Sequence, residues 1–134
     1  MASRTRIGLV ALALIVLSTV LVGCGGSSLK IGWLALGGRQ RKRAQYVTFD
    51  GTESKSFRVE AGQTVELACD VSVEKGSLSV TLLSPDGKRL WQESFLEDRE
   101  AFVTVTATET GLHILRIEGQ ETGGSFDISW RLKD

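Results

Sequence analysis

The side chains of this sequence that are best suited to catalysis, metal binding or covalent modification are two cysteines and one histidine. Cys24 directly follows the most apolar run of the chain, whereas Cys69 lies in a segment of alternating polar and apolar residues. His113 is the only histidine, so a site that needs two imidazoles cannot be assembled. No serine has the G-x-S-x-G setting of a nucleophile elbow, and no glycine-rich phosphate loop precedes a helical segment. We therefore expect no catalytic residue, no metal site, no cofactor and no enzymatic activity.

Carboxylates that could bind calcium occur at Asp86 and in one loop that holds Glu97, Asp98 and Glu100. Calcium prefers several such oxygen ligands at alternating spacing, as in an EF-hand loop. This spacing is absent here. A solvated acidic loop is the interpretation that we favour over a calcium site.

The residues before Cys24 have the pattern of an export signal. Arg4 and Arg6 precede residues 7–17, which contain no polar side chain, and small residues follow. A positive head, a short apolar stretch and a small-residue cut site are typical of a secretory signal peptide. A membrane-spanning helix, the alternative, needs about 20 apolar residues. We predict a signal-peptide helix over residues 1–23.

The sequence Leu21-Val22-Gly23-Cys24 resembles the lipobox of bacterial lipoproteins. The resemblance implies that a diacylglyceryl group alkylates the Cys24 thiol, that the chain is cut between Gly23 and Cys24, and that the mature protein carries acyl chains such as palmitate. It also implies a bacterial cell-membrane location, lipid-anchored on the extracytoplasmic face. The partner that the resemblance implies at this residue is membrane lipid.

Residues 24–44 have the composition of a flexible basic linker, because G-G-S-S is followed by five basic and no acidic residues. A basic run beside an anchor can lie on an anionic bilayer, and a tryptophan suits the interface. The membrane-surface contacts that we expect are Lys30, Trp33, Arg39, Arg41, Lys42 and Arg43. A solvated linker and an edge strand over residues 31–36 are the alternatives. Nucleic acid is not an expected partner outside the membrane.

Residues 45–134 show a period of two with breakers about every ten residues, which is typical of an antiparallel sandwich or barrel. We predict an all-β domain, a small jelly-roll-like antiparallel β-sandwich. Cys69 falls on the apolar face of its strand, where a free cysteine behaves as a small hydrophobe. The eight expected strands cover residues 46–49, 56–60, 64–73, 78–83, 89–95, 101–107, 112–118 and 125–132.

Four segments of this domain, S-F-R-V-E-A-G-Q-T-V-E-L, L-S-P-D-G-K, T-E-T-G-L-H-I-L-R-I-E-G and G-S-F-D-I-S-W, resemble landmarks of small exported bacterial modules. These modules are of the pre-peptidase C-terminal type and the related GOLD-like type. The resemblance implies a β-sandwich and transfers no catalytic residue. His113 stands where such modules usually carry tyrosine, so a partly buried aromatic substitute is favoured over a pH-sensitive switch.

The functional hypothesis is a membrane-anchored surface lipoprotein with a non-catalytic binding or structural module, whose partner is an envelope protein or a glycan. The alternative is a carbohydrate- or peptidoglycan-binding module at the cell wall, because exposed aromatic rings on a sandwich can stack on sugars. Trp91 is the candidate ligand contact. The apolar residues of its strand, Leu90, Trp91 and Phe95, do not all fall on one face, so Trp91 can be exposed. The core aromatics that we expect are Phe57, Phe95, Phe102, Phe126 and Trp130.

Overall fold

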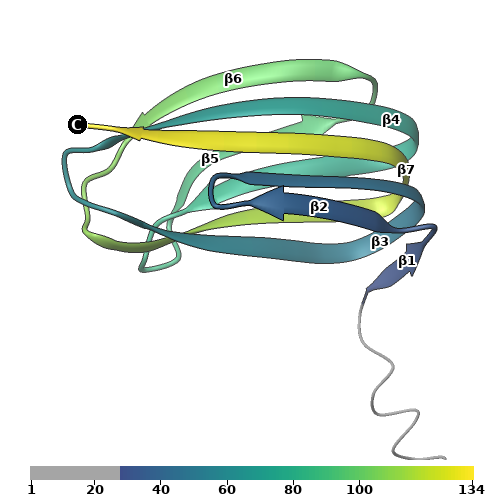
Figure 1. Cartoon of the computed structure of the whole chain (residues 1–134), viewed down its shortest axis with the longest axis horizontal. Helices are drawn as coiled ribbons and strands as arrows, with labels where there is room; N and C mark the ends of the chain where they lie inside the picture. Colours follow the sequence, from purple (N-terminus) through teal and green to yellow (C-terminus); the bar gives the residue numbers. More distant parts are fainter. Residues whose placement is uncertain (1–27) are drawn as a thin grey trace, which may run out of the picture.

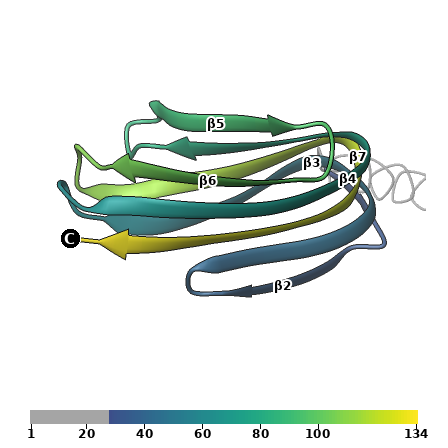
Figure 2. The ribbon, with the colours of Figure 1, turned by 90° about the horizontal axis from the view of Figure 1, so that it is seen from above.

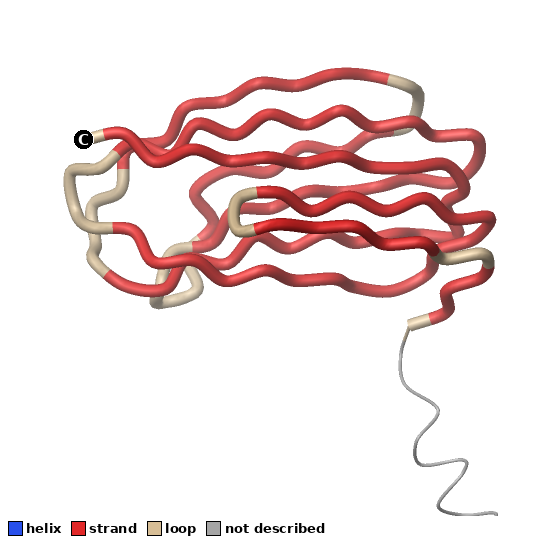
Figure 3. Tube along the Cα trace, in the orientation of Figure 1, coloured by secondary structure: helices blue, strands red, loops and turns tan. Residues whose placement is uncertain are grey.

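A computed structural model describes residues 28–134, so the predicted signal peptide and Cys24 lie outside the described residues. Every regular element within this range is a strand (Figure 3), and it includes no helix long and apolar enough to cross a bilayer. The all-β prediction is therefore confirmed. The strands are β1 (Leu29–Ile31), β2 (Leu34–Gly38), β3 (Arg41–Val59), β4 (Thr64–Leu83), β5 (Arg89–Phe95), β6 (Arg99–Thr106) and β7 (Gly111–Lys133).

Three long strands determine the architecture. The sheet order is β1-β3-β7-β4-β5, with β2 paired to β3 and β6 paired to β4, and all of these pairs are antiparallel. β3, β4 and β7 curve round together at one end of the molecule (Figures 1 and 2). The sheet thus folds into two layers, which confirms the predicted antiparallel sandwich.

Each layer contains one half of every long strand. Layer A consists of β2, the first half of β3, the second half of β7, the first half of β4, and β6. Layer B consists of β1, the second half of β3, the first half of β7, the second half of β4, and β5. Six of the eight predicted strands therefore merge in pairs, because the breakers between them bend a strand instead of ending it.

The bend depends on close backbone contact at glycines. The register of β3 shifts around Phe49, and that of β4 shifts around Lys75, as expected where β-bulges increase local bending. Gly124 of β7 has φ +138°, and a Cβ atom there would overlap the Ser72 carbonyl oxygen of β4. Only glycine allows this approach, because it has no Cβ and tolerates positive φ.

Aromatic and aliphatic side chains fill the space between the layers. Trp33 stacks on Tyr46, with ring centroids 5.6 Å apart, and also contacts Phe49 and Phe126. Phe57 stacks on Trp130 in a separate pair, with ring centroids 5.1 Å apart. Of the predicted core aromatics, Phe95, Phe126 and Trp130 are buried and Phe57 is partly buried, but Phe102 is 69% exposed, so that assignment is wrong.

The interpretation of residues 29–44 as a flexible linker is also wrong. β1 pairs with residues 48–50, and β2 pairs with residues 41–45, so the sheet begins at Leu29. The edge-strand alternative over residues 31–36 fits better, although Gly32, with φ +65°, divides that segment into two strands. The physical reason is that β2 extends layer A and Trp33 completes the aromatic cluster of the core.

Candidate functional site

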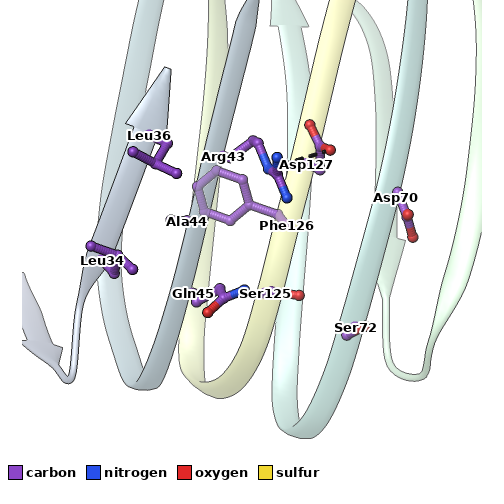
Figure 4. Close-up of a pocket in the computed structure, with 10 residues that line it drawn as sticks. All are labelled: Leu34, Leu36, Arg43, Ala44, Gln45, Asp70, Ser72, Ser125, Phe126 and Asp127. Atoms are coloured by element: carbon purple, nitrogen blue, oxygen red, sulfur yellow. Dashed lines mark ion pairs between the residues drawn. The ribbon is translucent and has the colours of Figure 1, made fainter.

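The outer surface of layer A is the candidate site, and we call it the layer A face. Directly opposed residues of antiparallel strands point to the same side of a sheet, so the register orders this surface into rows (Figure 4). Five strands separated by about 4.8 Å give it a width of about 19 Å. One row contains Leu36, Arg43, Asp127 and Asp70; the next contains Gly38, Arg41, Ser129, Ala68 and Phe102.

Side-chain size gives this face the shape of a trough. The central strands β7 and β4 present small residues, namely Ser125, Ser129, Ala68 and Ser72, whereas the two edge strands present large ones. Leu36 of β2 is 63% exposed, and Phe102 of β6 is 69% exposed. Three adjoining hollows along the face share residues from both sides, including Arg41, Asp70, Asp127 and Ser129. The result is a polar floor with one large apolar side chain at each edge, Leu36 on β2 and Phe102 on β6, in neighbouring rows; we call these two edges the walls of the trough.

Asp127 organises the charge on the floor. Arg41 donates to both of its carboxylate oxygens, from Nε at 2.8 Å and from Nη2 at 2.5 Å. Arg43 Nε lies 3.5 Å from the same carboxylate. The hydrogen bond from Arg41 is the main reason why the pKa of Asp127 is lowered. Bidentate geometry of this kind holds both partners in a fixed orientation.

The opposite side of the floor is acidic. Asp70 of β4 and Glu100 of β6 form no ion pair within residues 28–134. Both side chains are exposed, and both line the hollow beside Phe102. A ligand lying across the trough would therefore meet guanidinium donors on the β3 side and carboxylate acceptors on the β6 side.

Substitution Asp127→Asn is expected to reduce the loss of unfolding free energy that occurs as the pH falls. A folded-state pKa below the ordinary value of 3.8 means that the ionised carboxylate favours the folded form. This contribution is complete above the unfolded pKa of about 3.9 and is lost as the pH falls through the lower folded value. Urea unfolding at about pH 7 and about pH 2.5 should show a smaller difference in the variant than in the parent.

The control for this measurement is Glu97→Gln, which removes a carboxylate from the exposed β5–β6 loop. Because Glu97 forms no ion pair or side-chain hydrogen bond within residues 28–134, its replacement should leave the parent's pH difference intact. Equal profiles for Asp127→Asn and the parent would contradict the role assigned to the Arg41 hydrogen bond.

Four of the six residues predicted as membrane contacts, Trp33, Arg41, Lys42 and Arg43, line one hollow beside the β2–β3 turn. Arg39 is exposed in that turn, with no ion pair within residues 28–134. Lys30 of β1 lies beside Trp33. Contact of these residues with a membrane stays a prediction.

A second charge cluster joins these lysines to Glu53. Lys30 hydrogen-bonds to Glu53, and Lys42 Nζ lies 3.1 Å from its other carboxylate oxygen. Lys30 also lies over the Trp33 ring, 4.5 Å from the centroid. Burial, followed by the charges of Lys30 and Lys55, lowers the pKa of Lys42. Most of the predicted cations therefore already have acidic partners.

Trp91 and His113 lie away from the trough, whereas Cys69 lines one of its hollows. Trp91 lies in β5 of layer B, where it is partly buried and packs against the core. His113 is buried more completely than expected, and its Nδ1 lies 3.1 Å from the Gly111 carbonyl oxygen. Cys69 is free and buried, as predicted, and burial raises its pKa to about 12. Within residues 28–134, no group of three or more His, Cys, Asp or Glu side chains is arranged to hold a metal ion.

Phe102 is the site residue that the sequence interpretation missed. Along β6 the apolar residues Ala101, Val103 and Val105 alternate with Phe102 and Thr104. The first set is partly buried and the second is exposed. The sequence pattern could have predicted this exposure, because Phe102 falls on the same face of the strand as the threonines and not on the face of the valines. The partnership of Arg41 with Asp127 spans 86 residues and has no comparable local signal.

Comparisons with known proteins give no family assignment. No protein-family model matches the sequence, and no curated protein has a matching sequence. Among solved structures, a carbohydrate-binding module of Cellvibrio mixtus lichenase 5A, in complex with cellotriose, aligns at 15% identity over 79% of this chain and 89% of that chain, with a TM-score of 0.45. The pre-peptidase C-terminal domain of Bacillus anthracis collagenase aligns at 15% identity over 78% and 87%, with a TM-score of 0.47. Because these scores are low, the fold assignment rests on the strand pairing of the chain itself.

Proposed function

We propose that this chain is a lipid-anchored surface lipoprotein whose β-sandwich is a non-catalytic binding module, and that the layer A face takes the ligand. The trough is the observation that carries the proposal. It combines exposed apolar walls, Leu36 and Phe102, with a floor of hydroxyl, guanidinium and carboxylate groups. Binding sites typically combine apolar surface with a few fixed polar groups in this way.

The proposed anchor is a diacylglyceryl group on Cys24, followed by cleavage after Gly23. The support for it comes from the lipobox-like residues 21–24 and the apolar run before them. The first described strand begins at Leu29, five residues after Cys24. The module would then be held close to the outer side of the cell membrane.

A glycan is the class of ligand that the trough suits best. Sugars present hydroxyl groups along their edges and C–H groups on their faces, so they need planar polar side chains beside an aromatic ring. Phe102 provides the exposed ring, and Arg41, Asp127 and Asp70 provide donors and acceptors nearby. A trough about 19 Å wide has room for several sugar units. An envelope protein is the other partner that this face could bind.

The test is calorimetric titration of the full chain, purified in detergent, with chitohexaose, cellohexaose and solubilised peptidoglycan fragments. Phe102→Ala is expected to weaken glycan binding about tenfold, since stacking on an aromatic ring contributes about 1.4 kcal/mol. Phe102 is largely exposed, so the free energy of unfolding should change by no more than about 0.5 kcal/mol.

The matched control for this titration is Leu112→Ala. Leu112 is a large exposed apolar residue, but it lies in layer B. Glycan affinity should be unchanged in this variant. If none of these glycans binds to the parent chain, the glycan assignment fails. If Phe102→Ala binds as tightly as the parent, the layer A face is not the site.

A further inference from the structure

A cluster of exposed aliphatic side chains lies where the described chain begins. Leu29 and Ile31 of β1 and Val47 of β3 are between 49% and 62% exposed. A Cβ atom on Gly32 would lie 2.7 Å from Val47 Cγ2, so the β1–β2 connection lies directly against Val47. We call these three residues the apolar rim. The rim lies at the bend end of the sandwich, at the point where the chain enters it (Figure 1).

We propose that the apolar rim docks onto the lipid bilayer beside the anchor, and that the apolar side chains, rather than the basic residues, make the contact. This inference rests on the proposed anchor at Cys24. Scattered exposed apolar residues are normal on protein surfaces, but several on adjoining segments mark an interaction site. The bilayer is the occupant that the length of the chain favours.

Chain length restricts which part of the module can reach the membrane. Four residues separate Cys24 from Leu29, so the five Cα–Cα steps between them keep an anchored Cys24 within about 17 Å of Leu29. By contrast, Leu112 lies seven residues along β7 from Gly119 at the bend, which is about 23 Å of strand. An anchored chain therefore holds the rim near the lipid and leaves the far end of the sandwich in solution.

The basic residues near the rim are partly neutralised. Arg41 and Arg43 share Asp127, and Lys30 and Lys42 share Glu53. Asp50, which is opposite Leu29 in the β1–β3 register, adds negative charge to the rim. Some attraction to anionic lipid remains, because each carboxylate offsets one of its two partners, whereas burial of aliphatic side chains does not depend on charge. Docking by the rim should be insensitive to salt.

The test places an environment-sensitive dye on the full-length anchored chain. Val47→Cys and Leu29→Cys variants are labelled with a nitrobenzoxadiazole maleimide and reconstituted into phosphatidylethanolamine–phosphatidylglycerol vesicles. Dye emission should be stronger and at shorter wavelength than that of the same dye placed at position 112 in the same vesicles, and high salt should not remove this difference. Cys69 should not react, because it is buried and its pKa is raised to about 12.

The matched control is Leu112→Cys, labelled and reconstituted in the same way, where the dye should stay in solution. Docking is overturned if the dyes at positions 47 and 29 behave like the dye at 112, or if high salt removes the difference. Failure of the anchor gives a different result. In that case the parent chain, with no introduced cysteine, incorporates dye at Cys24 and does not float with vesicles.

Discussion

Replacing Cys24 with serine is expected to abolish lipid labelling and to release the module from membranes. Each buried methylene of an acyl chain contributes about 0.8 kcal/mol, so two long chains contribute on the order of 20 kcal/mol to membrane attachment. The serine oxygen should not accept the diacylglyceryl group that the lipobox resemblance assigns to the thiol. Metabolic labelling with radioactive palmitate and fractionation of cells into membrane and soluble material measure both effects. The unprocessed or released chain should contain no label.

The control for this experiment is Cys69→Ser. Cys69 is buried on the inner side of β4 and forms no disulfide within residues 28–134. Its replacement should reduce stability somewhat, because a hydroxyl replaces an apolar thiol in the core, but it should leave palmitate labelling intact. Undiminished labelling of Cys24→Ser would overturn the anchor assignment.

Gly124→Ala is expected to destabilise the sandwich by on the order of 4 kcal/mol, or to prevent folding. Two costs combine here. The positive φ of Gly124 is unfavourable for a residue with a Cβ, and this Cβ would overlap the carbonyl oxygen of Ser72. Strain and overpacking each contribute about 1–3 kcal/mol, and the overlapped atom belongs to the backbone, which cannot rotate away. Urea unfolding followed by circular dichroism measures the loss.

The control for the Gly124→Ala variant is Gly87→Ala. Gly87 also has positive φ, +84°, but a Cβ there would have no neighbour within 4 Å. Only the strain cost of about 1–2 kcal/mol should appear. If the two variants lose the same amount of stability, close packing of β7 against β4 at the bend is not the reason for glycine at position 124.

The strands of this module could be predicted from the sequence, but their continuity could not. Alternation identified the apolar faces of β4 and of the second half of β7, because burial follows a period of two. The Glu74-Lys75-Gly76 segment has the composition of a turn between separate strands. In the structure β4 continues through it into the other layer. Whether a glycine ends a strand or bends it depends on neighbours distant in sequence.

The contacts of the candidate site, like the continuity of the strands, could not be predicted from the sequence. Arg41 and Arg43 belong to a basic run that resembles a solvated linker, and only pairing with β7 reveals their partner Asp127. Trp33 has the amphipathic character of a membrane-interface residue, yet it packs on Tyr46 and Phe49. In both cases a local property was visible in the sequence, but the contact that determines the role lies more than ten residues away.

The walls of the trough belong to β2 and β6, the two edge strands of layer A. β2 pairs with β3 alone, and β6 pairs with β4 alone, whereas β3, β4 and β7 pass through both layers. Edge strands can open locally at a small part of the global unfolding cost. Amide hydrogens of β2 and β6 should therefore exchange faster than those of β7. For the proposed ligand site, we expect the distance between Leu36 and Phe102 to adjust to ligands of different width while the central strands stay folded.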